Sequence, residues 1–114
     1  MISKRDSSDI SYNNKELEDL ILRGQSTDKL YKKLSRNKRF MFDLNKVMGI
    51  LHSVSKISEL YDLKSLHYEP LKYNLSGFSS VRIGYTSKYR LMFIEQEGGI
   101  SIELINISEH YGDK

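Results

Sequence analysis

Two arginines, Arg82 and Arg90, stand in neighbouring segments that alternate like β-strands. If Tyr85-Thr86-Ser87 form the loop of a hairpin, the two arginines face each other directly. Opposed like charges destabilise a sheet unless an anion joins them, and guanidinium groups bind phosphate through a fixed fork of donors. The pair therefore favours a phosphate site. The alternative is that each arginine pairs with a carboxylate such as Glu69 or Glu103.

The same register sorts the side chains of this hairpin onto two faces. One face is apolar and carries Val81, Ile83, Tyr89, Leu91 and Phe93. The opposite face carries Ser80, Arg82, Lys88 and Arg90, with Phe78, Met92 and Ile94 at its far end. A slip of one residue would scramble this sorting, because successive side chains alternate between faces. Tyr89 is accordingly expected in the core.

A second hairpin is predicted at Glu97-Gly98-Gly99, because glycines allow the positive φ of tight turns. A short loop there puts Ile102 and Leu104 on the apolar face. It puts a second set of residues on the arginine face, namely Ile105, Ile107, Glu109 and Tyr111. His110 then points away from the arginines, and a bend after Ser108 would reverse the choice between His110 and Tyr111.

The elements before these hairpins are predicted to be mainly helical. Asp9-Ile10-Ser11-Tyr12 alternates like a short strand, and Asn13 or Asn14 can cap a helix that stops at Gly24. A second helix, the longest element, opens at Ser26, Thr27 or Asp28. Its apolar residues form one stripe: Leu30, Leu34, Met41, Leu44, Met48 and Leu51. A short helical turn is expected over 57–63.

The pattern changes at the single proline, Pro70, and is strand-like over 78–84, 88–95 and 100–108. This order predicts an α+β fold: a short N-terminal strand, then two to three helices packed on one face of a small antiparallel sheet. A length of 114 residues suits one domain over 1–114, with 1–8 as a loose tail.

Composition narrows the classes of function. Residues 28–90 hold thirteen basic and five acidic side chains, which is the footprint of a polyanion-binding surface or of a solvated basic helix face. The chain has no cysteine, no apolar run of membrane-spanning length and no signal-peptide pattern at its start. A cytoplasmic protein with no membrane partner is expected. The three histidines, His52, His67 and His110, lack metal-ligand spacing, so no metal and no cofactor is expected.

Four segments, in this order, carry a resemblance to a known family. The stretch 65–72, Ser-Leu-His-Tyr-Glu-Pro-Leu-Lys, resembles the "H-P-L-K-G" type motif of HigB-like proteins. Residues 77–83 and 88–93 resemble the "G-x-x-S-[VI]-R-[VI] … x-Y-R-L-x-F" core of RelE/ParE toxins. The segment 102–111 resembles the HigB-like ending, and 10–17 is similar to its opening. The resemblance, over 10–111, is to RelE/ParE toxins, nearest the HigB-like branch.

This resemblance implies a type II toxin that enters the ribosomal A site and cuts mRNA. It also implies a partner antitoxin, helix-turn-helix and HigA-like, that blocks the toxin. Cleavage would use the 2′-OH of the substrate as nucleophile, with a base, cations for the phosphorane and an acid for the leaving 5′-oxygen. Carried over by motif, Lys72 and Arg82 would steady the phosphate and Arg90 would help to position it. His110 or Tyr111 would move the proton.

The sequence departs from the family pattern at three places. Tyr111 stands at the terminal histidine position of the family, and could transfer a proton only if cations lower its pKa from about 10. His110 is the alternative, because its ordinary pKa of about 6.5 suits proton transfer. Tyr73 replaces a glycine, and Tyr85-Thr86-Ser87 replace an asparagine-bearing turn.

RNA contacts are expected from four other residues. They are Lys64, His67, Tyr73 and Lys88, for which the alternatives are a packed tyrosine and solvated side chains. Two other functions stay open. One is a ParE-like toxin that inhibits gyrase by binding, which has no need of the cleavage residues. The other is a degenerate, non-toxic RNA-binding homologue.

Overall fold

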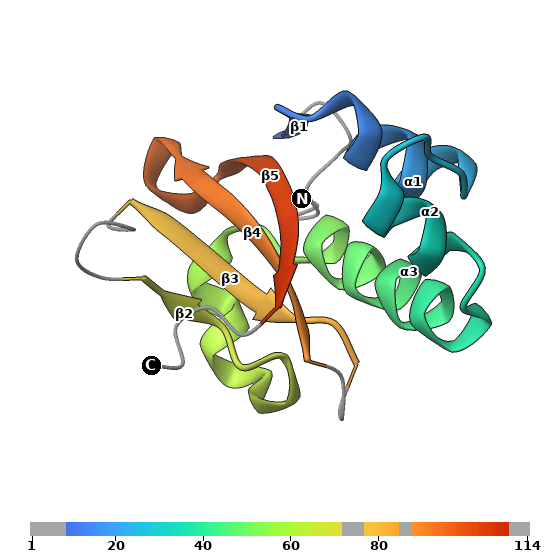
Figure 1. Ribbon diagram of the computed structural model, residues 1–114. Helices are drawn as coiled ribbons and strands as arrows, with labels where there is room; N and C mark the ends of the chain where they lie inside the picture. Colours follow the sequence, from blue (N-terminus) through green and yellow to red (C-terminus); the bar gives the residue numbers. More distant parts are fainter. Residues whose placement is uncertain (1–8, 72–76, 85–87, 110–114) are drawn as a thin grey trace.

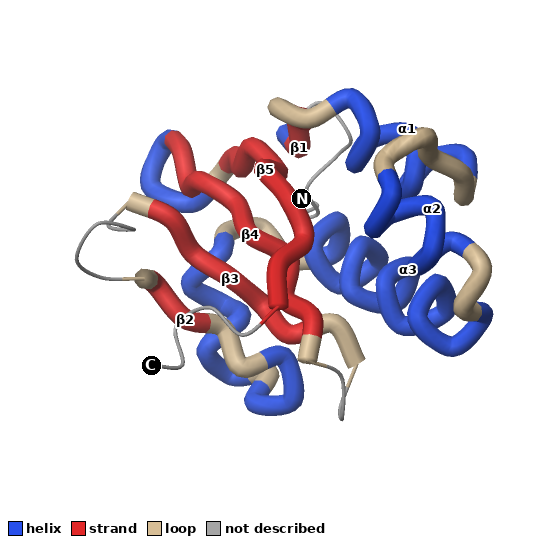
Figure 2. The backbone as a smooth tube through the Cα atoms, in the orientation of Figure 1, coloured by secondary structure: helices blue, strands red, loops and turns tan. Residues whose placement is uncertain are grey.

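The computed structural model describes residues 9–71, 77–84 and 88–109. It is an α+β protein in which helices cover one face of a five-stranded sheet (Figures 1 and 2). This confirms the predicted fold class. The strands are β1 (Ile10–Tyr12), β2 (Glu69–Pro70), β3 (Phe78–Arg82), β4 (Tyr89–Gln96) and β5 (Ser101–Glu109).

The sheet has the order β1-β5-β4-β3-β2. Strands β2 to β5 pair antiparallel, as predicted, whereas β1 lies parallel to β5 at the sheet edge. The β3–β4 register is the one predicted from the loop, with Arg82 opposite Arg90 and Val81 opposite Leu91. The two arginines therefore share one cross-strand position.

The β4–β5 register differs from the prediction beyond Leu104. Phe93 pairs with Leu104 but Met92 pairs with Asn106, so Ile105 is the extra residue of a β-bulge. The bulge turns Ile107 onto the apolar face, where it lies opposite Leu91 and is buried. Glu109 likewise lies opposite Tyr89. The assignment of Ile107 and Glu109 to the arginine face was therefore wrong, because the bulge reverses the alternation from Ile105 onward.

Helix α1 (Lys15–Arg23) is bounded as its sequence predicts. The side chain of Asn14 accepts a hydrogen bond from the Leu17 amide at 3.1 Å, which caps the first turn. Gly24 ends the helix in the left-handed conformation, with φ of 70°. The side chain of Asn14 also donates to the Ile105 carbonyl at 3.2 Å, which joins α1 to the bulge of β5.

The long second helix of the prediction is two helices, α2 (Lys29–Ser35) and α3 (Lys38–Ser53). Asn37 separates them, since its side chain accepts from the Phe40 amide at 3.0 Å and caps α3. The apolar stripe stays in phase across this break, which is why its period alone predicted one helix. Short 3₁₀ helices follow: η2 (Ile57–Asp62), which confirms the expected helical turn, and η3 (Lys64–Leu66).

The hairpin between β4 and β5 is closed by η5 (Glu97–Gly99), as the glycines predicted. Gly99 has φ of 91°, and a Cβ there would lie 3.3 Å from the backbone nitrogen of Ile57. Glycine is thus required both by the turn and by the close approach of η2. The hairpin and the helical layer are packed together at this point.

The core lies between the sheet and the helices. Its fully buried members come from α1, α3, η2 and the inner sheet face, among them Leu17, Leu44, Ile57, Val81, Leu91, Phe93, Ile102 and Leu104. Tyr89 is partly buried against it and meets the Phe40 ring edge-on at 5.5 Å, as expected for a core tyrosine. In the described part of the chain, no helix has the length and hydropathy to cross a membrane.

Candidate phosphate-binding site

Arg90 is held by three groups of the neighbouring strands. Its Nε donates to the Oγ of the buried Ser80 at 2.9 Å, and its Nη2 donates to the His67 carbonyl at 2.5 Å. The same Nη2 lies 3.6 Å from Oε1 of Glu69, and the Arg90 side chain is 15% exposed. The guanidinium therefore reaches from β4 across β3 to the segment of β2, and the proposed alternative of a carboxylate partner holds for Arg90.

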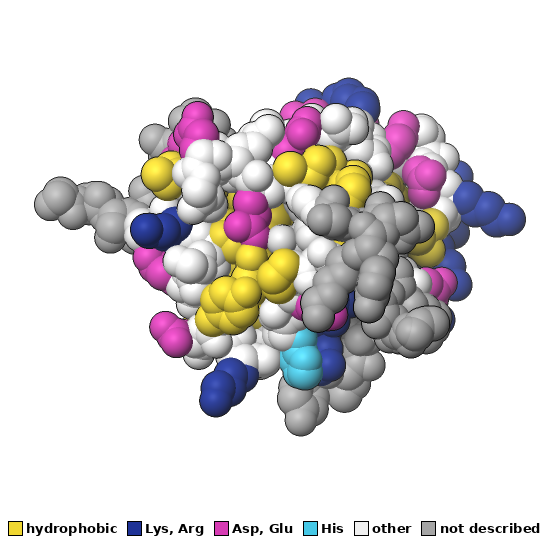
Figure 3. All heavy atoms as spheres, turned by 90° about the vertical axis from the view of Figure 1, so that its left-hand side faces the viewer, with side chains coloured by type: hydrophobic (Ala, Val, Ile, Leu, Met, Phe, Trp, Pro, Cys, Tyr) yellow, Lys and Arg dark blue, Asp and Glu magenta, His cyan; other side chains and the backbone are white. Residues whose placement is uncertain are grey.

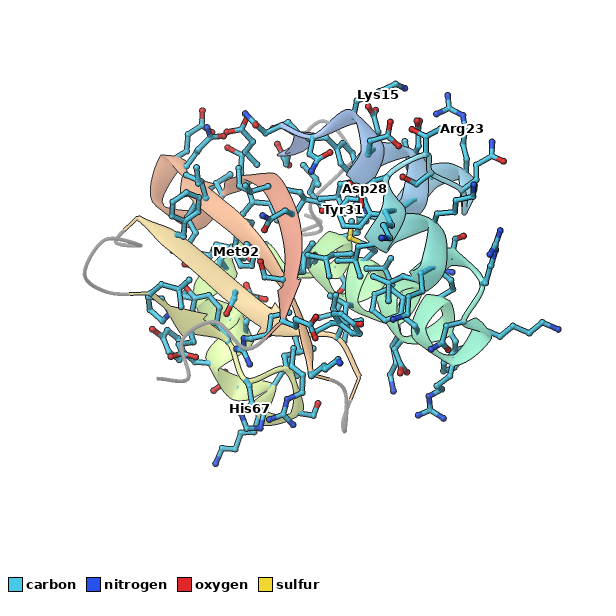
Figure 4. The ribbon with its side chains drawn as sticks, viewed as in Figure 1. Lys15, Arg23, Asp28, Tyr31, His67 and Met92 are labelled. Atoms are coloured by element: carbon cyan, nitrogen blue, oxygen red, sulfur yellow. The ribbon has the colours of Figure 1, made fainter. Side chains whose placement is uncertain are left out.

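His67 can meet Arg90 through its backbone because of its conformation. It follows η3 with φ of 48°, in the left-handed region that few non-glycine residues adopt. Its side chain is exposed and lies at the lower end of the molecule in Figure 4, far from Lys15 and Arg23 of α1. The described contact of His67 with the predicted site is thus made by its carbonyl.

Arg82 has different surroundings. It lines a pocket of about 120 Å³ that lies between the end of β3, η3 and α3. The charged side chains around this pocket are three cations, Arg39, Lys46 and Arg82, and one carboxylate, Asp43. Arg39 pairs with Asp43 through Nε at 3.1 Å. The net charge of the lining is positive, so the pocket suits an anion such as a phosphate.

Arg39 and Lys46 were not among the residues predicted for this site. They are seven residues apart on α3 and so lie on one side of the helix. A signal that could have found them is that Lys46 directly precedes Val47, which is buried and lines the same pocket. The predicted arginine pair is thereby extended by two cations from a segment far away in the sequence.

Lys88 contacts the end of β5 and Tyr89. The alternation placed it on the face of Arg90, but its amine lies 3.0 Å from Oε1 of Glu109 and 5.6 Å from the centroid of the Tyr89 ring. Hydrogen bonding to the Glu109 carboxylate, with its negative charge, raises the pKa of Lys88. Lys88 immediately precedes β4 and is not part of the strand. The β-bulge brings Glu109 opposite Tyr89, and the Lys88 amine pairs with that carboxylate.

The remaining predicted residues divide into two groups. Lys64 begins η3, is exposed and adjoins Ser65, which lines the Arg82 pocket. Lys72, Tyr73, His110 and Tyr111 lie outside the described residues. The alternation that placed Tyr111 on the arginine face ends at the bulge. Their roles stay predictions.

The side of the molecule near β2 and β3 is shown in Figure 3. Hydrophobic side chains gather at the centre of this face, and Lys and Arg side chains lie scattered around them. The concentrated positive charge is instead found where α3 meets the end of β3. Over the described ranges, no three His, Asp or Glu side chains are grouped so that they could hold a metal ion.

Comparison with known proteins identifies the fold. The chain matches no family model and no curated protein sequence. The solved structure of a YoeB/ParE toxin from Agrobacterium tumefaciens is similar to it with a TM-score of 0.51. The two sequences are 17% identical over 90% of this chain and 98% of that one. The chain therefore has the fold of the RelE/ParE toxins, as its motifs implied; the HigB-like branch stays a prediction.

Proposed function

We propose that the chain is the toxin of a toxin–antitoxin pair and cleaves mRNA on the ribosome. The observation that carries the proposal is the cross-strand pair of Arg82 and Arg90, extended by Arg39 and Lys46 at the end of β3. The toxin fold supports it. Such a protein works in the cytoplasm, where ribosomes are, and its gene is expected beside that of a helix-turn-helix, HigA-like antitoxin.

The proposed chemistry needs only the chain and its substrate. A base takes the proton of the 2′-OH, which attacks the adjacent phosphorus while the bond to the 5′-oxygen breaks. Arg82 and Lys72 stabilise the charge of the phosphorane, and Arg90, fixed by Ser80 and the His67 carbonyl, positions the phosphate. An acid protonates the departing 5′-oxygen. No metal ion takes part in this scheme.

The proton-transfer group is proposed to be His110 or Tyr111. His110→Ala and Tyr111→Phe distinguish them, since only loss of the true group should slow cleavage strongly. A general acid or base contributes about 10²- to 10⁴-fold to the rate. Lys64, Lys88, the His67 ring and Tyr73 are proposed as RNA contacts, whose replacement should weaken RNA binding more than the rate of cleavage.

A second candidate is gyrase inhibition, because the similar solved structure is described as a YoeB/ParE toxin. The experiment that separates the candidates is to induce the chain alone in bacteria and map the 5′ ends of mRNA. New 5′ ends within coding regions are expected. Intact messages together with double-strand DNA breaks would point to gyrase. The absence of both mRNA cleavage and DNA breaks would point to a degenerate, non-toxic homologue.

A further inference from the structure

The outer side of α3 carries an aromatic ring among basic residues. Phe42 is 62% exposed, although large hydrophobic side chains are normally buried. Lys38 and Lys46 are four residues away on either side, and Arg39 is three residues before it. Residues three and four apart are neighbours on a helix surface, so the ring is bordered by cations. One of them, Lys46, also lines the Arg82 pocket.

Gly49 lies seven residues after Phe42, two turns further along the same side of the helix. It is exposed, and a Cβ added there would meet no atom within 4 Å. Glycine in a helix interior costs about 0.5–1 kcal/mol relative to alanine, and no packing contact here requires it. Phe42, Gly49 and the neighbouring cations Lys38, Arg39 and Lys46 thus form one exposed strip of α3.

We propose that this strip binds single-stranded RNA outside the cleavage site. A base stacks on the Phe42 ring, while Lys38, Arg39 and Lys46 contact the backbone phosphates on either side. Aromatic rings among cations bind single strands in this manner, because each base has a face to stack and each nucleotide a charge. The strand leads from Phe42 past Lys46 to the pocket of Arg82. The inference rests on the proposed RNA-directed function for its biological role.

The surface fits a nucleic-acid strand better than a protein helix. A docked amphipathic helix needs anchors that recur at three, four and seven residues. Around Phe42 those positions hold Lys38, Arg39, Asn45, Lys46 and Gly49. The other exposed large hydrophobic side chains in the described chain, Leu22, Tyr61, Leu63 and Ile100, belong to other segments. One aromatic ring surrounded by positive charge matches stacking and phosphate contact instead.

The test measures binding without cleavage. A fluorescent 2′-O-methyl oligouridine of about 12 nucleotides has no free 2′-OH and cannot be cut by the proposed reaction. Phe42→Ala should weaken its binding about 10-fold, on the order of one lost base stack. Lys38→Ala and Lys46→Ala should each lower the slope of log affinity against log salt by about 0.7. Binding to the same sequence in a duplex should change little with Phe42→Ala.

Phe42→Trp provides a rescue and a direct signal. The chain has no tryptophan, so the new residue is its sole source of indole fluorescence. Binding should return, and RNA should quench that fluorescence as a base stacks on the ring. Leu22→Ala is the matched control, because Leu22 is 61% exposed but lies on α1. It should leave the affinity for RNA unchanged.

The inference is overturned if Phe42→Ala binds the single strand as well as the unaltered chain does. Retained RNA binding with lost affinity for the antitoxin would overturn it too, and would assign the strip to a protein partner. Failure of the proposed function looks different: the oligonucleotide would bind through Phe42, yet ribosome-bound mRNA would remain uncut.

Discussion

Arg82 and Arg90 occupy the same cross-strand position on β3 and β4, yet their surroundings differ. Arg90 is enclosed by Ser80, the His67 carbonyl and Glu69. Arg82 lines a pocket with two cations of α3. A guanidinium fixed by protein acceptors positions what lies near it, whereas a cluster of cations attracts an anion. Two arginines at one cross-strand position thus differ: Arg90 is tied to neighbouring protein groups, whereas Arg82 belongs to a cluster of positive charge.

The largest expected effect is on activity at Arg82. Arg82→Ala should lower the rate of mRNA cleavage by about 10²-fold or more, as when one charge-stabilising donor is lost from a transition state. The cleavage rate of Arg82→Lys should lie between those of the unaltered chain and Arg82→Ala, because lysine keeps the positive charge but lacks the forked donors of the guanidinium. Cleavage by purified protein on programmed ribosomes measures both. Undiminished cleavage by Arg82→Ala would remove the anion role of this residue.

The loss of Arg90 should, in addition, destabilise the fold. Arg90→Ala should lower the free energy of unfolding by about 1.5–3 kcal/mol, because hydrogen bonds to a charged group are lost and the buried Ser80 hydroxyl loses its donor. Urea unfolding measures this. Glu69→Gln is the control, since the Glu69 side chain is 53% exposed and a solvated ion pair of this kind contributes about 0–1 kcal/mol. Unchanged stability of Arg90→Ala would contradict the structural role of its contacts with Ser80 and the His67 carbonyl.

Tyr31 offers a destabilising change on the helical side of the sheet, outside the contacts described above for either arginine. Its hydroxyl accepts from the Ile107 amide at 3.1 Å beside the bulge of β5, and its side chain points toward that strand (Figure 4). Tyr31→Phe should cost about 1–3 kcal/mol by leaving a buried amide without this acceptor. Cleavage per folded molecule should stay unchanged, measured below the unfolding transition. Loss of cleavage by folded Tyr31→Phe would contradict this expectation, because it would show that a change in stability alone can reduce cleavage.

The smallest expected effect is pH-dependent and lies in the N-terminal region. Hydrogen bonds from Ser26 and Thr27 lower the pKa of Glu16 to about 2 from an ordinary 4.5. Because the folded pKa is lowered, the stabilisation is present above pH 4.5 and is lost as the pH falls toward 2. The melting temperature of Glu16→Gln should therefore lie below that of the unaltered chain at pH 6, and the gap should close near pH 2. A constant gap would contradict this assignment.

The sequence predicted the arginine pair because β3 and β4 sort cleanly into two faces around a short loop. It could not predict the bulge, since Ile105 and Ile107 are equally apolar and the alternation fits either face. Nor could it predict the break at Asn37, because Leu34 and Met41 stay in phase across it. The contact of Arg90 with the His67 carbonyl is made by backbone, which carries no sequence signal. Arg39 and Lys46 were not predicted, because only the tertiary packing of α3 brings them to the pocket of Arg82.

The proposed function requires that this chain cuts RNA by attack of the substrate's own 2′-OH. Its most direct test uses purified chain, ribosomes and an mRNA with a single 2′-deoxy nucleotide at the mapped cleavage position. The unmodified message should be cut to a fragment ending in a 2′,3′-cyclic phosphate, and the 2′-deoxy message should remain whole at that position. Cleavage of the 2′-deoxy message at the same bond would contradict it.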